Sequence, residues 1–206
     1  MCTKLQAVVL TLLLAFTFWG CSALPQSIVG VRSSVELTSI DGRGALRPVL
    51  PTRIYRFVDE NTADIILTDL SLEDLTGDGA NPATGQIVHV QLFIRPRPGR
   101  TPIERTACSA SVRYAVLARG EAGIYAGAGF LVPESVPGGS LFGGSMTRSP
   151  VRLVRATGQF VDLLGPAEAD ISFTAKRDDE TVTRWMSIMD RLALVGKPIE
   201  AEAALP

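Results

Sequence analysis

Short segments rich in β-branched and aromatic residues follow one another along most of this chain. From about Ser33 onward, clusters of Gly, Pro and Asp separate them roughly every 8–14 residues, which is typical of an antiparallel β-barrel or β-sandwich. The sequence therefore predicts a mainly β domain of about eight or nine antiparallel strands. The predicted strands cover residues 34–40, 53–58, 63–69, 86–95, 108–118, 123–131, 141–147, 151–157 and 169–176.

Two of these segments alternate between apolar and mixed residues, as half-buried strands do. One face of 86–95 is apolar, with Val88, Val90, Leu92 and Ile94, and the other is mixed, with Ile87, His89, Gln91, Phe93 and Arg95. In 108–118 the same alternation places Cys108 on the apolar face with Val112 and Tyr114. We therefore expect Cys108 to be a buried structural thiol rather than a nucleophile.

Helical periodicity occurs only near the end of the chain. Asp178 or Asp179 can cap a helix, and Gly196 and Pro198 can end it. Between them an apolar stripe recurs at spacings of three and four, formed by Val182, Trp185, Met186, Met189 and Leu192. We expect this helix to pack on the sheet or to plug one end of a barrel. In layout alone, strands followed by one helix resemble small calycin-type barrels such as lipocalins, although none of that family's motif residues is present.

The N-terminus has the pattern of an export signal. The apolar run from Leu5 to Trp19 is shorter than the roughly 20 residues that span a bilayer, so residues 1–20 are interpreted as a signal peptide. The sequence Phe18-Trp19-Gly20-Cys21 resembles the lipobox of bacterial lipoproteins, in which a small residue precedes a lipidated cysteine. Gly20 and Cys21 match that pattern, whereas Phe18 and Trp19 differ from it. An uncleaved anchor and a simple exported protein therefore remain alternatives.

The resemblance implies a lipid on Cys21 and a place in the bacterial cell envelope, facing the periplasm or the exterior. Because Ser22 replaces the Asp that commonly retains such proteins in the inner membrane, the outer membrane is favoured. Residues 21–32 lack periodicity and are interpreted as a tether, followed by one domain over 33–198 and a mobile tail over 199–206.

Composition excludes several classes of function. With 20 basic and 21 acidic residues and a net charge of −1, the chain lacks the basic excess that nucleic-acid binding requires. The single histidine, His89, excludes metal sites that need two imidazoles, and no metal or cofactor is predicted. Cys2 leaves with the signal peptide and Cys21 carries the lipid, so Cys108 has no partner for an intramolecular disulfide in the mature chain.

The candidates for chemistry are few. Mixed-face residues can converge inside a barrel, so His89, Asp64 and Glu104 are candidates for an acid–base set of an isomerase or hydrolase. A satisfied hydrogen-bonding histidine is the alternative. A small anionic or apolar ligand would be bound in a cavity lined by His89, Gln91, Arg95 and Arg113. No catalytic template is complete, so binding of a ligand or partner is favoured over catalysis, and a purely structural envelope protein is a third alternative.

Three further patterns are ambiguous. Arg95, Arg97, Arg100 and Arg105 cluster around one turn and Arg148, Arg152 and Arg155 around a strand, either as anion sites or as ordinary solvated arginines. The glycine runs 123–129 and 138–144 fit no phosphate-binding template, so we expect close backbone packing or bulges there. The long loops 71–84 and 133–140 are either a ligand mouth or plain connections.

Overall fold

The structure is a computed structural model that describes residues 33–76, 83–97 and 108–199. The predicted signal peptide, the tether and residues 200–206 lie outside the described residues. The elements are β1 (Ser34–Ser39), β2 (Ala45–Leu46), β3 (Thr52–Phe57), β4 (Ala63–Thr68), α2 (Leu72–Thr76), β5 (Gly85–Leu92), β6 (Ala110–Ala118), β7 (Glu121–Gly129), β8 (Leu131–Pro133), β9 (Leu141–Ala156), β10 (Ala167–Arg177), α3 (Asp179–Val195) and β11 (Lys197–Pro198).

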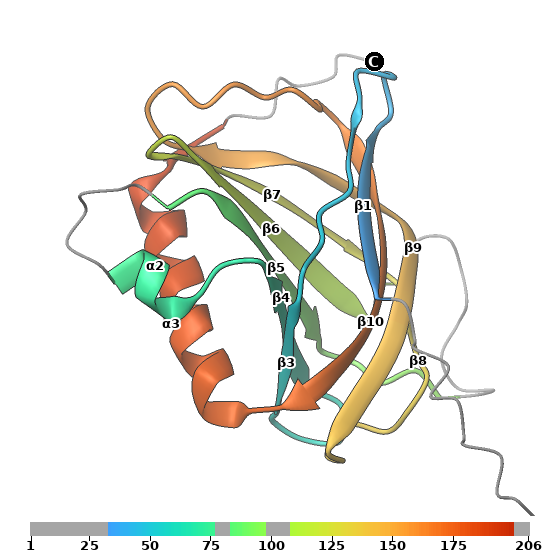
Figure 1. The fold of residues 1–206 in the computed structure, drawn as a ribbon. Helices are drawn as coiled ribbons and strands as arrows, with labels where there is room; N and C mark the ends of the chain where they lie inside the picture. Colours follow the sequence, from blue (N-terminus) through green and yellow to red (C-terminus); the bar gives the residue numbers. More distant parts are fainter. Residues whose placement is uncertain (1–32, 77–82, 98–107, 200–206) are drawn as a thin grey trace, which may run out of the picture. The chain divides into compact units, whose positions relative to one another are not determined.

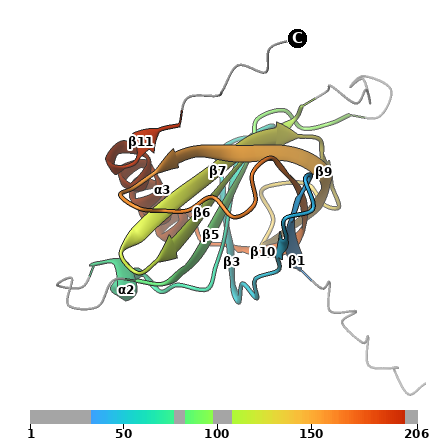
Figure 2. The same ribbon diagram turned by 90° about the horizontal axis from the view of Figure 1, so that it is seen from above.

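Seven of these strands close into a ring in the order β3, β4, β5, β6, β7, β9 and β10 (Figures 1 and 2). The ring closes where Lys176 and Arg177 of β10 pair with Ile54 and Tyr55 of β3, and this pairing is parallel. All its other neighbours are antiparallel. Strand direction cannot alternate all the way around an odd-numbered ring, so at least one pair must be parallel. The predicted mainly β fold is confirmed as a barrel, and it departs from the expected antiparallel arrangement at this one pairing.

Strand β9 unites the two segments predicted at 141–147 and 151–157. Its first half lies between β8 and β10, and its second half pairs with β7. At Arg148 the backbone takes a left-handed conformation with φ of 47°, beside a register shift between Ala169 and Ile171 of β10. This local irregularity changes the direction of one continuous strand, whereas the sequence pattern predicts two separate strands. The short strands β2, β8 and β11, of two or three residues each, were not predicted.

Large side chains fill the interior of the ring. Tyr55, Tyr114, Tyr125, Phe142 and Phe173 are all at most 2% exposed and belong to one apolar cluster. Phe142 lies against both Tyr55 and Phe173, with ring centroids 5.5 and 5.7 Å apart. The alternation predicted for 86–95 is confirmed over β5, where Val88, Val90 and Leu92 join this cluster and Ile87 points outward.

Helix α3 packs on the outer face of the barrel. Asp178 caps it by accepting a hydrogen bond from the Thr181 backbone N–H at 3.0 Å, and Gly196 follows its last turn, as predicted. Its buried residues form a second cluster with Ile66, Ile87, Ala115 and Ile124 of the sheet. They are Val182, Trp185, Ile188 and Met189. Burying each of these side chains contributes roughly 2 kcal/mol of hydrophobic free energy, before the entropy cost of ordering it is subtracted. The helix therefore covers the sheet and does not plug the barrel.

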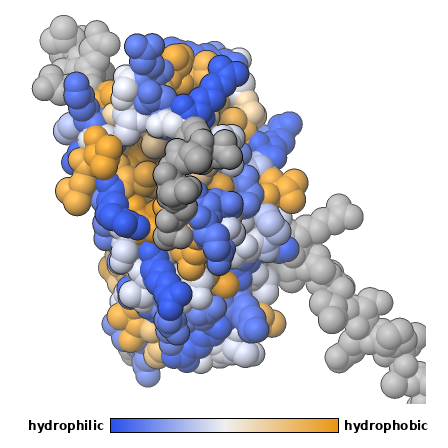
Figure 3. Space-filling view, turned by 60° about the vertical axis from the view of Figure 1, so that its left-hand side comes forward, coloured by the Kyte–Doolittle hydropathy of each residue, from blue (hydrophilic) through white to orange (hydrophobic). Residues whose placement is uncertain are grey.

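The outer side of α3 is mostly polar. In Figure 3, hydrophilic side chains run along this side of the domain and apolar ones show in patches between them.

Among the described residues, no helix is both long and apolar enough to span a bilayer.

Close packing explains the glycines of 123–129, as predicted. A Cβ on Gly127 would lie 1.9 Å from the carbonyl oxygen of Pro150, and one on Gly129 would lie 2.2 Å from the Ser149 hydroxyl. A register shift also separates Ile124 from Tyr125 in the pairing of β7 with β9. Side chains at these positions would push the two strands apart.

Candidate functional site

His89 and Asp64 meet, but not where the sequence analysis expects them. They lie on the neighbouring strands β5 and β4, and their side chains point out of the barrel toward α3. The prediction that the two side chains converge inside the barrel is therefore wrong. The interior positions of these strands are apolar, and the polar pair occupies the opposite face. Glu104, the third candidate, lies outside the described residues.

Asp64 is the centre of this arrangement. Its Oδ1 lies 3.0 Å from Nε2 of His89, and its Oδ2 accepts a hydrogen bond from Nη2 of Arg56 at 2.7 Å. The side chains of Asp64 and His89 are only 1% and 2% exposed, whereas that of Arg56 is 27% exposed. A buried carboxylate is tolerated here because each of its oxygens has a donor.

Arg113 on β6 completes the set from the other side of the imidazole. Its Nε and Nη2 lie 3.2 and 3.1 Å from Nδ1 of His89, and its Nη1 donates to Oδ1 of Asp190 on α3 at 2.8 Å. A guanidinium only donates, so Nδ1 must be the acceptor and the imidazole proton lies on Nε2, directed at Asp64. We call Arg56, Asp64, His89, Arg113 and Asp190 the polar cluster.

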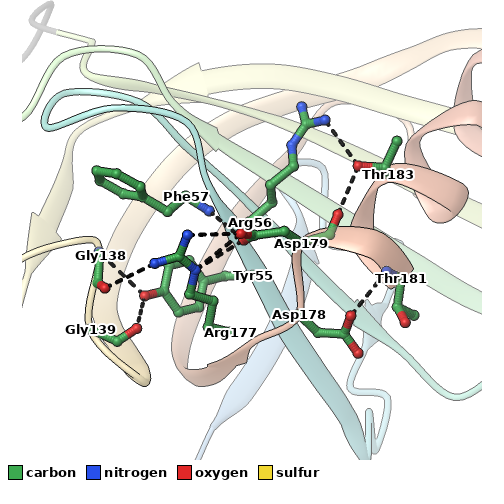
Figure 4. A network of polar contacts seen from close by, with 10 residues as sticks. All are labelled: Tyr55, Arg56, Phe57, Gly138, Gly139, Arg177, Asp178, Asp179, Thr181 and Thr183. Atoms are coloured by element: carbon green, nitrogen blue, oxygen red, sulfur yellow. Dashed lines mark hydrogen bonds and ion pairs between the residues drawn. The ribbon is translucent and has the colours of Figure 1, made fainter.

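The polar cluster forms hydrogen bonds with helix α3 at two places. Arg56 donates through Nη1 to the Thr183 hydroxyl at 3.2 Å, and Thr183 donates in turn to the backbone carbonyl of Asp179 at 2.7 Å (Figure 4). Two turns further along α3, Asp190 accepts the hydrogen bond from Arg113. These bonds set the rotation and height of α3 on the barrel more strictly than apolar packing alone would.

The same bonds leave His89 little capacity for catalysis. Its lone pair accepts from Arg113, its proton is donated to Asp64, and its side chain is almost entirely buried. A general base needs a free lone pair within reach of a substrate proton. The arrangement is that of a satisfied, structural histidine, which is the alternative that the sequence also allows.

Burial alone would raise the pKa of Asp64. The hydrogen bonds from His89 and Arg56 outweigh it, so the pKa lies below its ordinary value of 3.8. Asp64 is therefore an anion at neutral pH and not a proton donor.

The other predicted ligand-binding residues are dispersed. Gln91 is half-buried on the same outward face, opposite Asp64 on β4 and Ser111 on β6. Arg95 is half-buried beyond the end of β5, and Arg113 is committed to the polar cluster. The structure does not bring the four predicted ligand-binding residues together around one interior cavity, because His89 and Arg113 point outward.

The arginines of the two predicted clusters do not gather around one site in the described residues. Arg155 donates to the carbonyl of Gly196 at 3.0 Å, and the backbone N–H of Arg148 donates to Asp170 at 3.1 Å. Arg152 is exposed. Arg100 and Arg105 lie outside the described residues, so the predicted cluster around that turn stays a prediction.

Two tyrosines inside the barrel form polar contacts that the sequence analysis missed. The Tyr114 hydroxyl donates to the side-chain oxygen of Gln86, and the Tyr125 hydroxyl donates to Oδ1 of Asp162 at 2.7 Å. Burial is the main cause that raises the pKa of both phenols above the ordinary value, so both stay protonated. The alternation of β6 placed Tyr114 on the inner face, but only the fold brings these acceptors to the barrel's end.

Cys108 is exposed, so the prediction of a buried thiol is wrong. Strand β6 begins only at Ala110, and the alternation that buries Ala110 and Val112 does not extend back to Cys108. Cys21 lies outside the described residues, and its lipidation stays a prediction.

The two long loops have different roles. In 71–84 the chain forms the short helix α2, which was not predicted, and residues 77–82 are not described. The 133–140 loop crosses back to β3, where the backbone N–H of Gly138 donates to the Tyr55 hydroxyl at 3.3 Å. That hydroxyl also donates to the carbonyl of Gly139. This loop is a bonded connection at the end of the barrel.

Within the described ranges, no group of three or more His, Cys, Asp or Glu side chains is placed to hold a metal ion. Comparison with protein-family models, with curated proteins and with solved structures found no match to this chain.

Proposed function

We propose that this chain is an exported bacterial envelope protein, anchored by lipid on Cys21, whose barrel domain acts by binding a partner at its surface. The apolar leader and the Gly20-Cys21 pair support the anchor. Acyl chains contribute about 0.8 kcal/mol per buried methylene, so two or more of them would hold the N-terminus at a bilayer. Ser22 favours the outer membrane.

The observation that carries binding over catalysis is the state of His89. It is the chain's one histidine, and both of its ring nitrogens are engaged by Asp64 and Arg113 under α3. A neutral-pH acid–base enzyme built on this residue would have to break both contacts before each turnover. Binding needs no such rearrangement.

Surface binding is favoured over a ligand inside the barrel. Aromatic side chains, among them Tyr55, Phe142 and Phe173, occupy the interior at full burial. A small anionic or apolar ligand would have to displace them. The cost would be several kcal/mol, because interiors are packed as densely as organic crystals.

Intact mass spectrometry of the protein from membranes of a bacterial host tests the anchor. The expected product starts at Cys21 and carries acyl mass. Cys21→Ala abolishes this mass, and the matched control Cys108→Ala keeps it. A wild-type chain without acyl mass would overturn the lipid anchor. Separation of inner and outer membranes then tests the predicted location, and a chain found in the inner membrane would contradict it.

The barrel-enzyme alternative keeps one supporting observation, the 3.0 Å contact between His89 and Asp64, which resembles the base–carboxylate pair of many hydrolases. His89→Gln distinguishes the two functions once a substrate or partner is known. We expect partner binding to survive this substitution. A loss of turnover in a variant that keeps its circular dichroism spectrum and its melting temperature would favour the enzyme.

A further inference from the structure

Six large apolar side chains are exposed at one end of the barrel. This end is where β3, β5, β7 and β10 finish and where β4, β6 and β9 begin, so its connections come from across the whole ring. We call these six residues the apolar rim: Val58, Phe93, Ile94, Val132, Val136 and Leu141, which are 39–56% exposed. Single exposed apolar residues are ordinary, but a group of this size at one end indicates a contact surface.

The rim is held in place by bonds beneath it. Arg177 donates through Nη1 to the carbonyl of Gly138 at 3.1 Å, pairs with Asp179 at 2.8 Å, and lies 5.3 Å above the ring of Phe57 (Figure 4). The Tyr55 hydroxyl joins the same loop from within the barrel. Val136 is therefore presented by an anchored loop rather than by one free to fold inward.

The tether enters the domain close to this end. The Ser33 hydroxyl accepts a hydrogen bond from the backbone N–H of Thr174, three residues before the last residue of β10 and seven after its first. At about 3.3 Å per residue, Ser33 lies roughly 10 Å from the rim end along β10 and roughly 23 Å from the other end. If residues 21–32 are the flexible tether that the sequence predicts, the stretch from Cys21 to Ser33 would span about 17–21 Å on average. The rim end lies well within that span, and the opposite end lies beyond it.

The opposite end is less suited to a bilayer. It also exposes large apolar side chains, among them Ile40, Val161 and Leu163, which are 60–72% exposed, so its greater distance from the tether is what distinguishes it from the rim.

Charge at the rim is mixed. Arg95 follows Ile94 directly, and Asp59, Glu60 and Glu134 lie at the same end. Arginine side chains beside an apolar contact can extend to phosphate while their stems stay among the acyl chains.

We propose that the apolar rim rests on the lipid surface to which the N-terminus is tethered. This inference rests on the proposed membrane anchor and adds the orientation of the domain. Phe93, Ile94 and Val132 enter the headgroup region, while α3 and the far end of the barrel face away and remain available to a partner. The acyl chains hold the protein at the bilayer, and the rim sets which surface it presents.

Tryptophan probes test the orientation. Ile94→Trp and Val132→Trp report on the rim, and Leu163→Trp, at a position 72% exposed at the opposite end, is the matched control. The parent chain supplies the background, because Trp185 lies on the buried face of α3 and Trp19 leaves with the predicted signal peptide. Each full chain is isolated from host membranes and reconstituted in vesicles of phosphatidylethanolamine and phosphatidylglycerol, with and without brominated acyl chains.

We expect bromine to quench the probes at 94 and 132 and to leave the probe at 163 at the level of the parent. Equal quenching at all three positions, or none at 94 and 132, would overturn the inference. Probes at 94 and 132 that are shielded from aqueous iodide but not quenched by bromine would indicate a protein partner there and would also overturn it.

Failure of the anchor is measured separately, by mass. In a chain shown to be acylated, absent rim quenching refutes the orientation and leaves the anchor intact. In a chain without acyl mass, the anchor fails, and adding the same vesicles to the isolated protein still decides whether the rim binds lipid.

Discussion

Replacing Asp64 by Asn tests whether the polar cluster holds α3 on the barrel. The substitution keeps the shape of the side chain and removes its charge. The buried side chain is 1% exposed and neutralises Arg56 at 2.7 Å, while accepting the His89 proton at 3.0 Å. In Asp64→Asn the amide can still accept from one of these donors, but its NH2 group faces the other.

The expected cost follows from the burial of the partners. Breaking a fully buried ion pair costs about 3–5 kcal/mol, and the 27% exposure of Arg56 lets water compensate part of this, which leaves roughly 2–4 kcal/mol. For a domain of this size that corresponds to a melting temperature lower by about 4–16 °C. Asp190→Asn is the matched control, because Asp190 is 61% exposed and its pair with Arg113 contributes at most about 1 kcal/mol.

The pH dependence adds a second readout. Because the pKa of Asp64 is lower in the folded chain, the unfolded chain binds the extra proton first as pH falls. The stabilisation is therefore complete above the ordinary value of 3.8 and is lost as pH falls from there through the folded pKa. The difference between wild type and Asp64→Asn should shrink over that range and stay constant at neutral pH.

Thermal and urea unfolding, followed by circular dichroism, measure these differences at each pH. The reasoning is refuted if Asp64→Asn and Asp190→Asn shift the melting temperature equally. It is also refuted if the effect of Asp64→Asn does not change between pH 7 and pH 2. A variant that never folds would still be informative beside a folded Asp190→Asn, because it places the cost above the stability of the domain.

Three further predictions concern packing and titration. Gly127→Ala should destabilise the barrel by more than about 2 kcal/mol, because the new Cβ would lie 1.9 Å from the Pro150 carbonyl oxygen, whereas Gly139→Ala, with 3.5 Å to its nearest atom, should leave the melting temperature within experimental error. Trp185→Ala should cost about 3–5 kcal/mol in urea unfolding, since this 1% exposed side chain is the largest that α3 packs onto the barrel; a loss below 1 kcal/mol would contradict that packing. Burial raises the pKa of Tyr125 well above 10.0, so stability should fall as pH rises past 10, and a spectrophotometric titration in which every tyrosine ionises near 10 without unfolding would be inconsistent with the structure.

Local patterns were sufficient for most of the strands and for α3. The alternation in 86–95 located β5, and the stripe that includes Val182 and Trp185 located the helix and its buried face. These signals succeed because side-chain direction has a period of two in strands and near 3.6 in helices. They fail where the alternation in the sequence extends beyond the end of the strand, as at Cys108, which precedes the first residue of β6.

The arrangement of the strands could not be predicted from such patterns. A period of two identifies the two faces of His89's strand but not which of them becomes the inside of a ring. That depends on where α3 packs and on the pairing of β10 with β3, which joins residues more than 100 positions apart in sequence. Arg56 and Asp190 carry no sequence signal of their own, so the polar cluster is visible only in three dimensions.

The parallel contact between β3 and β10 also governs when the barrel can form. Strands β4 to β7 are joined by successive antiparallel pairings and can assemble as the chain is delivered from its N-terminus. β3 joins them through its antiparallel pairing with β4, but its other edge pairs only with Lys176 and Arg177, near the end of the domain. Whether the chain emerges from a ribosome or from a membrane pore, most of it must leave before the ring closes. The ordering cost of this long loop therefore falls at the last step, and until β10 is available β3 to β7 can form only an open sheet.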